Sequence, residues 1–119
     1  MKKFITAQLF LFVICIAHIT YANSDIVEVD LIIKNHKFEP EILTLPAGKK
    51  IRITVYNQDA TIEAFESIDL KREKIVLGKS KARVILAPLK PGEYKFFGDF
   101  HAETAQGKII ITKETENNV

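Results

Sequence analysis

Short runs of β-branched and aromatic residues, each followed by turn residues, constrain the fold of this chain more than any other feature. Segment 51–56 shows the pattern most clearly, because Ile51, Ile53 and Val55 point to one side of an extended strand and the residues between them point to the other. No segment has a helical pattern longer than a turn or two. Turn signals spaced by about 8–12 residues therefore indicate an all-β sandwich of seven or eight strands.

The other predicted strands are 27–33, 38–45, 61–70, 73–77, 82–86, 94–97 and 107–112. The segments 73–77 and 82–86 flank Gly78-Lys79-Ser80, which predicts that they pair as a hairpin. The residues expected in the core are Phe38, Ile51, Ile53, Val55, Phe65, Ile85, Tyr94, Phe96, Ile109 and Ile111.

The first 22 residues have the pattern of a secretory signal peptide. Lys2 and Lys3 precede an uncharged, mostly apolar stretch, and Thr20-Tyr21-Ala22 is suited to cleavage. We therefore expect a cleaved signal at 1–22, a folded domain at 23–113 and a polar tail at 114–119. A retained anchor is the alternative, which the short apolar stretch disfavours. Export predicts a periplasmic protein that is not inserted in the membrane after cleavage.

Charge and cysteine content exclude several classes of partner and site. The chain has 17 basic and 15 acidic residues, and loss of Lys2 and Lys3 with the signal leaves the two kinds equal in number. Neither nucleic acid nor an anionic membrane is therefore predicted as a partner. The single cysteine, Cys15, lies in the signal, so the exported domain has no disulfide and no thiolate ligand.

A loop rich in potential metal ligands lies between the last two predicted strands. Asp99, His101 and Glu103 occupy alternate positions, which share one face wherever the backbone is extended. His36, at the end of the first strand, is expected to be a solvated loop histidine. No serine or cysteine nucleophile accompanies a histidine and no glycine-rich phosphate loop is present, so hydrolase or NTPase activity has no support.

Five short motifs follow one another in cupredoxin order and spacing. They are Phe38-Glu39-Pro40, Pro46-Ala47-Gly48, Asn57-Gln58-Asp59, the segment 90–96 and the loop from His101 to Ile109. The chain resembles cupredoxins over nearly all of the predicted domain. It is most similar to the cupredoxin-like domains that accompany bacterial periplasmic iron uptake, including the EfeO type, in segment 61–73 and the Gly98–His101 loop. This resemblance implies a Greek-key sandwich that binds copper or iron at one end.

The family's copper ligands are only partly present. The first histidine position falls on Glu63, six residues after Asn57, and the second falls on His101. The cysteine position falls on Gly98, and the axial methionine would lie near Ala105 or Gln106. A blue copper centre requires the thiolate, so Gly98 excludes it.

Carboxylates around one imidazole replace the blue-copper ligand set, and such oxygen-rich sets suit iron, manganese or copper(II). In an extended strand Glu63 and Glu66 face opposite sides, so ligation by both would need a bulge or turn. The predicted metal ligands are His101, Asp99, Glu66, Glu63 and Glu103.

We expect a periplasmic protein that binds copper or iron at a non-blue site and assists iron uptake through a membrane permease or another periplasmic metal-handling partner. The alternative is a metal-free cupredoxin-like module that docks to a periplasmic or membrane partner. A copper-dependent ferroxidase is the least favoured function, because no second redox site is evident.

Overall fold

The computed structural model describes residues 26–113, which form nine strands and one short 3-10 helix. The predicted signal peptide at 1–22 and the predicted tail at 114–119 lie outside the described residues, as do the first three residues of the predicted domain. Within residues 26–113, no helix has the length and apolar character needed to cross a membrane.

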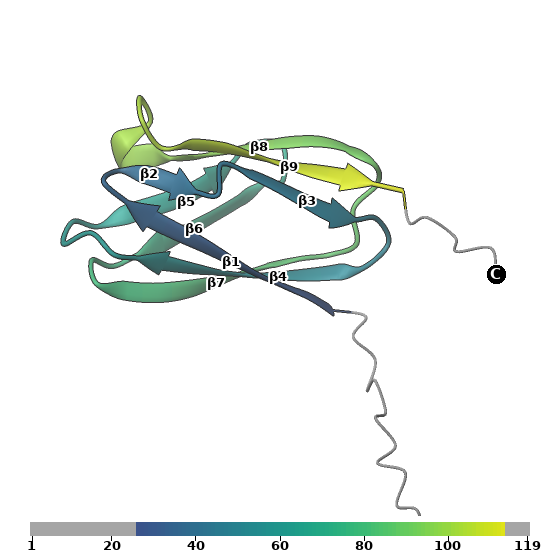
Figure 1. Cartoon of the computed structure of the whole chain (residues 1–119), viewed down its shortest axis with the longest axis horizontal. Helices are drawn as coiled ribbons and strands as arrows, with labels where there is room; N and C mark the ends of the chain where they lie inside the picture. The colour runs from purple at the N-terminus through teal and green to yellow at the C-terminus, as the bar shows by residue number, and fades with distance from the viewer. Residues whose placement is uncertain (1–25, 114–119) are drawn as a thin grey trace, which may run out of the picture.

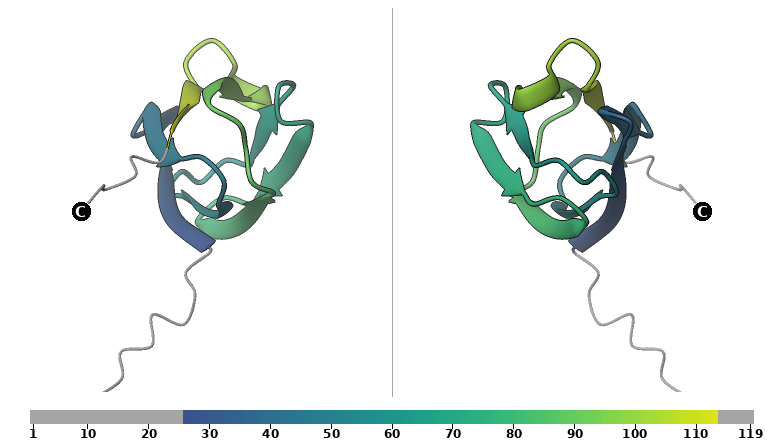
Figure 2. Two further views of the ribbon diagram at one scale, coloured as in Figure 1. Left: turned by 90° about the vertical axis from the view of Figure 1, so that its right-hand side faces the viewer. Right: turned by 90° about the vertical axis from the view of Figure 1, so that its left-hand side faces the viewer.

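Two sheets form the two layers of a sandwich (Figures 1 and 2). The first has the order β2-β1-β4-β7 and the second the order β3-β9-β8-β5-β6. The first sheet contains β1 (Ile26–Lys34), β2 (Lys37–Glu39), β4 (Lys50–Asn57) and β7 (Ser80–Leu86). The second contains β3 (Ile42–Pro46), β5 (Glu63–Ser67), β6 (Arg72–Val76), β8 (Gly92–Gly98) and β9 (Gln106–Thr112).

Each sheet contains one parallel pair of strands. β1 runs parallel to β4 with Val29 opposite Ile53, and β3 runs parallel to β9 with Leu43 opposite Ile109. The other neighbours are antiparallel. This confirms an all-β sandwich with one strand more than the predicted upper number.

Side chains that alternate along the strands fill the space between the layers. Three phenylalanines from three strands meet in this core: the ring of Phe38 lies edge-on to Phe96 with centroids 5.0 Å apart, and Phe65 stacks on Phe96 at 5.1 Å. Burial of such rings supplies much of the hydrophobic free energy that a small domain without disulfides needs. Eight of the ten predicted core residues are buried.

The two exceptions are Ile85 and Tyr94. Ile85 is 39% exposed on the outer side of β7, because Val84 and Leu86 take the two inward positions on that strand. Tyr94 is only partly buried and packs at the edge of the core.

Two predicted strand arrangements are wrong. Segment 38–45 is not one strand, since β2 ends at Glu39 and β3 begins at Ile42 in the opposite sheet. The chain crosses between the layers at Pro40, which has no amide hydrogen for a sheet ladder. The predicted hairpin of 73–77 with 82–86 also does not form, because β6 pairs with β5 and β7 pairs with β4. The Gly78–Ser80 turn is instead another crossing between layers.

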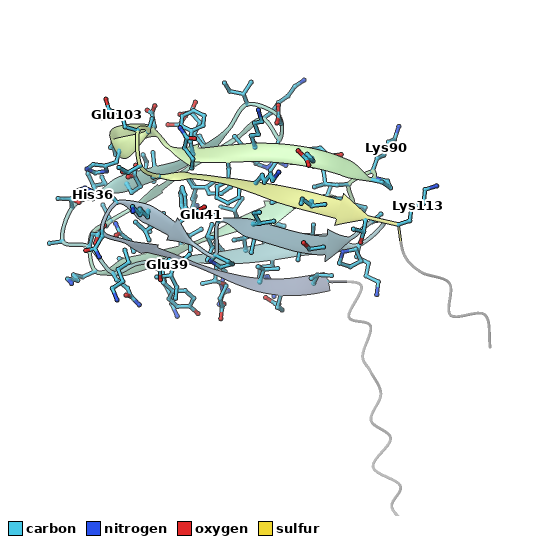
Figure 3. All side chains as sticks on the ribbon, turned by 45° about the horizontal axis from the view of Figure 1, so that its top comes forward. His36, Glu39, Glu41, Lys90, Glu103 and Lys113 are labelled. Atoms are coloured by element: carbon cyan, nitrogen blue, oxygen red, sulfur yellow. The ribbon has the colours of Figure 1, made fainter. Side chains whose placement is uncertain are left out.

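One end of the sandwich gathers loops that are distant in sequence. The β1–β2 turn, the start of β5 and the helix η1 (Asp99–His101) meet there. In Figure 3 His36 and Glu103 lie near this end, whereas Lys90 and Lys113 lie at the other.

Candidate functional site

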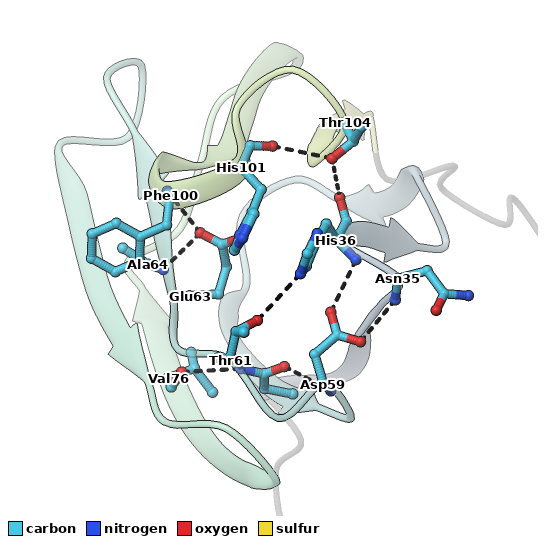
Figure 4. Close-up of polar contacts among 11 residues, drawn as sticks. Asn35, His36, Asp59, Thr61, Glu63, Ala64, Val76, Phe100, His101 and Thr104 are labelled. Carbon is cyan, nitrogen blue, oxygen red and sulfur yellow. Dashed lines mark hydrogen bonds and ion pairs between the residues drawn. The ribbon is translucent and has the colours of Figure 1, made fainter.

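Glu63 is a carboxylate buried at the end of the sandwich, with only 1% of its surface exposed. Its Oε1 accepts hydrogen bonds from the backbone amides of Ala64 at 3.0 Å and Phe100 at 2.9 Å. Its Oε2 lies 2.5 Å from Nδ1 of His101 (Figure 4). The carboxylate thus has a hydrogen-bond donor for each oxygen, and the burial of its charge is compensated by these bonds.

His101 is the last residue of η1, and its side chain is about one quarter exposed. Its backbone carbonyl accepts bonds from the amides of Ala105 and Thr104, which fold the loop back after the helix. Because an ionised carboxylate can only accept hydrogen bonds, the contact with Glu63 assigns a ring proton to Nδ1. The condition under which residues 99, 101 and 103 would share one face, an extended backbone, is not met, because η1 and a turn occupy this segment.

His36 stacks on His101, with ring centroids 3.6 Å apart and an interplanar angle of 11°. Its Nε2 lies 3.3 Å from the Thr61 hydroxyl oxygen. His36 lies in a loop and is partly exposed, as predicted, but His101 covers one face of its ring, which was not predicted. The two-residue turn between β1 and β2 carries His36 over the end of the sandwich, onto a loop 65 positions later in the chain.

A network that starts at the end of β4 holds this turn. The Asp59 carboxylate accepts the backbone amides of Asn35 and His36, each at 2.9 Å. The Asn57 side chain accepts the amide of Asp59 at 3.0 Å and donates to the carbonyl oxygen of Thr61 at 2.8 Å. The Asn-x-Asp motif therefore connects the turn that carries His36 to the segment that leads to Glu63.

The pKa of Asp59 reflects these contacts. Its partial burial acts to raise the pKa, but the hydrogen bonds from the His36 and Asn35 amides, together with the positive charges of His36 and Lys79, lower it overall.

Gly98 makes room for the Glu63 carboxyl group. A Cβ atom at residue 98 would lie 2.7 Å from Cδ of Glu63 and 2.7 Å from Cβ of Ala105. The space next to the family's cysteine position is thus filled by Glu63 itself. The residues present do not fit a blue copper centre, because the thiolate is missing and no side chain can be added there without moving a neighbour.

The other three predicted ligands lie apart from Glu63 and His101. Glu66 is on the outer side of β5, opposite Glu73 on β6, and Asp99 and Glu103 are exposed. No hydrogen bond or ion pair within residues 26–113 joins these three carboxylates to His101. The pKa of Glu66 is raised, mainly because neighbouring atoms displace water from its carboxylate and secondly because the negative charges of Asp99 and Glu73 lie nearby.

Of the predicted set, the structure therefore brings together Glu63 and His101 and adds His36. Within residues 26–113, no three His, Cys, Asp or Glu side chains already have the arrangement of a metal site. The His36 and His101 rings are parallel instead of converging on one point. The signal for His36 in the sequence was the Asn35-His36 turn between two strands, a position that brings its side chain to the same end as the last loop.

Comparison with known proteins agrees with this fold. The chain is 56% identical over 89 residues to an uncharacterised protein of Rickettsia prowazekii (strain Madrid E). The matched segment covers 75% of this chain and 71% of that protein. Among solved structures, it is similar to auracyanin A, a blue copper protein of Chloroflexus aurantiacus, with a TM-score of 0.64 and 16% identity over 73% of this chain and 99% of that one.

Two further structures share the architecture. The metal-binding domain of the Streptococcus pneumoniae Cu(I)-exporting P-type ATPase CopA, solved with Cu(I), matches with a TM-score of 0.65 and 11% identity, over 76% of this chain and 89% of that one. The purple cupredoxin of Nitrosopumilus maritimus matches with a TM-score of 0.53 and 22% identity, over 71% of this chain and 99% of that one. The sequence model of the cupredoxin-like domain family matches residues 4–111, and the chain therefore belongs to the cupredoxin-like family.

Proposed function

We propose that this protein binds a divalent transition-metal ion, copper or iron, at a non-blue site that contains Glu63 and His101. The observation that carries the proposal is the contact between these two side chains, 2.5 Å apart at the end of the sandwich. They stand at the two positions where the family resemblance places histidine ligands. A divalent ion would take the place of the proton that the carboxylate and the imidazole share.

The chemistry of the two donors supports a hard or borderline ion. Neutral imidazole and carboxylate are ligands for Fe(II), Mn(II) and Cu(II), whereas Cu(I) prefers thiolate and thioether. The Ala64 and Phe100 amides that bind Oε1 would keep the carboxylate in place while Oε2 takes the ion. One of the similar solved structures, the metal-binding domain of CopA, holds Cu(I), which supports metal binding by this fold without indicating which ion this protein binds.

We extend the proposal to the place and partner of the protein. The predicted signal peptide supports a periplasmic location, and the resemblance to domains of the EfeO type supports a role beside an iron permease. Fractionation of cells tests the first, and co-purification with a membrane permease under iron limitation tests the second. A protein confined to the cytosol would contradict both.

Calorimetric titration of the purified protein with Cu(II) and, without oxygen, with Fe(II) and Mn(II) tests metal binding. We expect at least one ion to bind with a Kd below about 10 µM, or roughly 7 kcal/mol of binding free energy. The His101→Ala and Glu63→Gln variants should bind at least tenfold more weakly. Glu66→Gln is the matched control, because this carboxylate lies three residues away on the outer side of β5, and it should bind as the wild type does. Binding no tighter than about 1 mM for all three ions would refute the proposal.

A metal-free interaction module is the second candidate function. It is favoured by the hydrogen bonds that already satisfy the Glu63 carboxylate and by the absence of a ready three-ligand arrangement in residues 26–113. Thermal melting separates the two functions, because an ion at a hundredfold excess over its Kd adds about 2.7 kcal/mol to the stability. A melting temperature that no ion changes would support the metal-free module.

A further inference from the structure

His36 is held at the site by three kinds of contact that do not depend on one another. Its ring stacks on His101 at 3.6 Å. Its amide donates to Asp59 at 2.9 Å, and its carbonyl oxygen accepts the hydroxyl of Thr104 at 2.6 Å. Thr104 lies in the loop that follows His101, so both histidine-bearing segments are connected through backbone and side chain (Figure 4).

The backbone of the turn also limits which residue types fit at position 36. Asn35 and His36 have φ values of 52° and 56°, in the left-handed region that suits asparagine or glycine. A histidine at the second position of such a turn has a conformational cost that the neighbouring Asp59 and Thr104 contacts offset. Glycine would form the same turn with less strain and asparagine is also tolerated there, so the turn alone does not require an imidazole.

We infer that His36 is a third ligand of the proposed site, which would give a set of two imidazoles and one carboxylate for a ferrous ion. This inference rests on the proposed function and deepens it. Two histidines and one carboxylate with open positions are the ligand set that proteins use for non-haem Fe(II). The partial exposure of His101 leaves this end accessible to an ion from solvent.

Binding requires a change in the orientation of His36. The two rings are parallel, so the His36 ring must turn before a nitrogen from each ring can reach one ion. Among residues 26–113, the only side-chain hydrogen bond of His36 is the contact of 3.3 Å with Thr61, which is long and exposed. The backbone contacts of the turn can stay in place while the side chain rotates.

Anaerobic titration with Fe(II) tests the inference in the wild type and in His36→Asn. Asparagine tolerates the left-handed backbone and removes only the imidazole. We expect at least a tenfold loss of Fe(II) affinity with little change in the melting temperature of the metal-free protein. Asn35→Gly is the matched control, because it alters the same turn without removing a ligand, and it should bind as the wild type does.

X-ray absorption at the iron edge gives a readout that does not depend on the variant's folding. We expect two imidazoles bound to iron in the wild type. One imidazole, or unchanged affinity in His36→Asn, would overturn the role of His36 while the proposed metal site at Glu63 and His101 still stands. Absence of Fe(II) binding by the wild type, with Cu(II) bound, would overturn the ferrous assignment. Binding of neither ion would instead refute the proposed function.

Discussion

Two carboxylates on β5, Glu63 and Glu66, lie three residues apart in the chain, and their surroundings differ. Glu63 is buried, and together with His36 and His101 it forms what we call the His–Glu cluster, in which every carboxylate oxygen meets a donor. Glu66 faces outward with Asp99 and Glu73 nearby, and we call these three residues the acidic patch. No cation is bonded to Glu66 within residues 26–113, whereas Glu63 has an imidazole.

The difference follows from strand geometry. Positions 63 and 66 are an odd number of residues apart, so their side chains leave β5 on opposite sides. The inward side places Glu63 against Gly98 and η1, and the outward side places Glu66 among like charges. The buried glutamate Glu63 thus stabilises the end of the sandwich and is a candidate ligand, whereas the outward glutamate Glu66 is repelled by its neighbours.

The largest expected effect comes from removing the buried carboxylate. Glu63→Ala would leave a cavity and would remove the acceptor of two amides, the buried one of Ala64 and the part-buried one of Phe100, which should cost about 3 kcal/mol of unfolding free energy. Urea denaturation of the metal-free protein measures this loss. Glu63→Gln keeps the shape of the side chain and one oxygen that can accept the backbone amides, so its loss of unfolding free energy should be clearly smaller. Equal stability of Glu63→Ala and wild type would show that the cluster does not hold the end of the sandwich together.

A second effect comes from filling the space beside Glu63. Gly98→Ala would place a methyl group 2.7 Å from Glu63 Cδ and from Ala105 Cβ, which should cost about 2 kcal/mol. In the Glu63→Ala background one of these two close contacts disappears, so the cost of the same substitution should fall by roughly half. Denaturation of the single and double variants forms the cycle that tests this coupling. Additive effects would mean that Gly98 and Glu63 do not compete for one space.

Most of the fold could be predicted from local patterns. The alternation of Ile51, Ile53 and Val55 and the run at 94–97 gave strands that the structure confirms. Sequence patterns could not show which layer a strand joins, because a short turn such as Gly78–Ser80 can close a hairpin or carry the chain across to the other sheet. That choice depends on long-range pairing, as β6 with β5 illustrates.

The candidate site was predictable only where the family resemblance assigns a ligand position. The family resemblance assigned Glu63 and His101 to the two histidine positions, and the structure joins their side chains. Residue type alone could not show that Asp99 and Glu103 are exposed and lie apart from Glu63, because their direction depends on the short helix and turn at 99–104. His36 was missed as a partner because its contact depends on a turn 65 positions before His101 in the chain.

A third, smaller effect concerns the anchor of the His36 turn. Asp59→Ala removes the acceptor for two backbone amides and should cost about 1 kcal/mol at neutral pH. The pKa of Asp59 is lowered in the folded protein, so its contribution is present above its unfolded pKa and is lost as the pH falls through the folded value. The stability difference between wild type and variant should therefore shrink in acid. A difference that stays constant between neutral pH and about pH 3 would argue against a role for the Asp59 charge.

The smallest effect is expected in the acidic patch, where a substitution should stabilise the protein instead of destabilising it. The pKa of Glu66 is raised in the folded protein, so the folded state holds its proton more tightly than the unfolded state does. Stability then decreases as the pH rises from the unfolded pKa to the folded pKa, and above both values the charge of Glu66 is mildly destabilising. Glu66→Gln should raise the melting temperature slightly at neutral pH and give no gain in strong acid, where the carboxyl is protonated in both states. Melting curves at both pH values, with the exposed Glu103→Gln as control, test this sign. A decrease at neutral pH would mean that Glu66 has a favourable partner, and a bound cation among Glu66, Asp99 and Glu73 would then become the competing explanation for the patch.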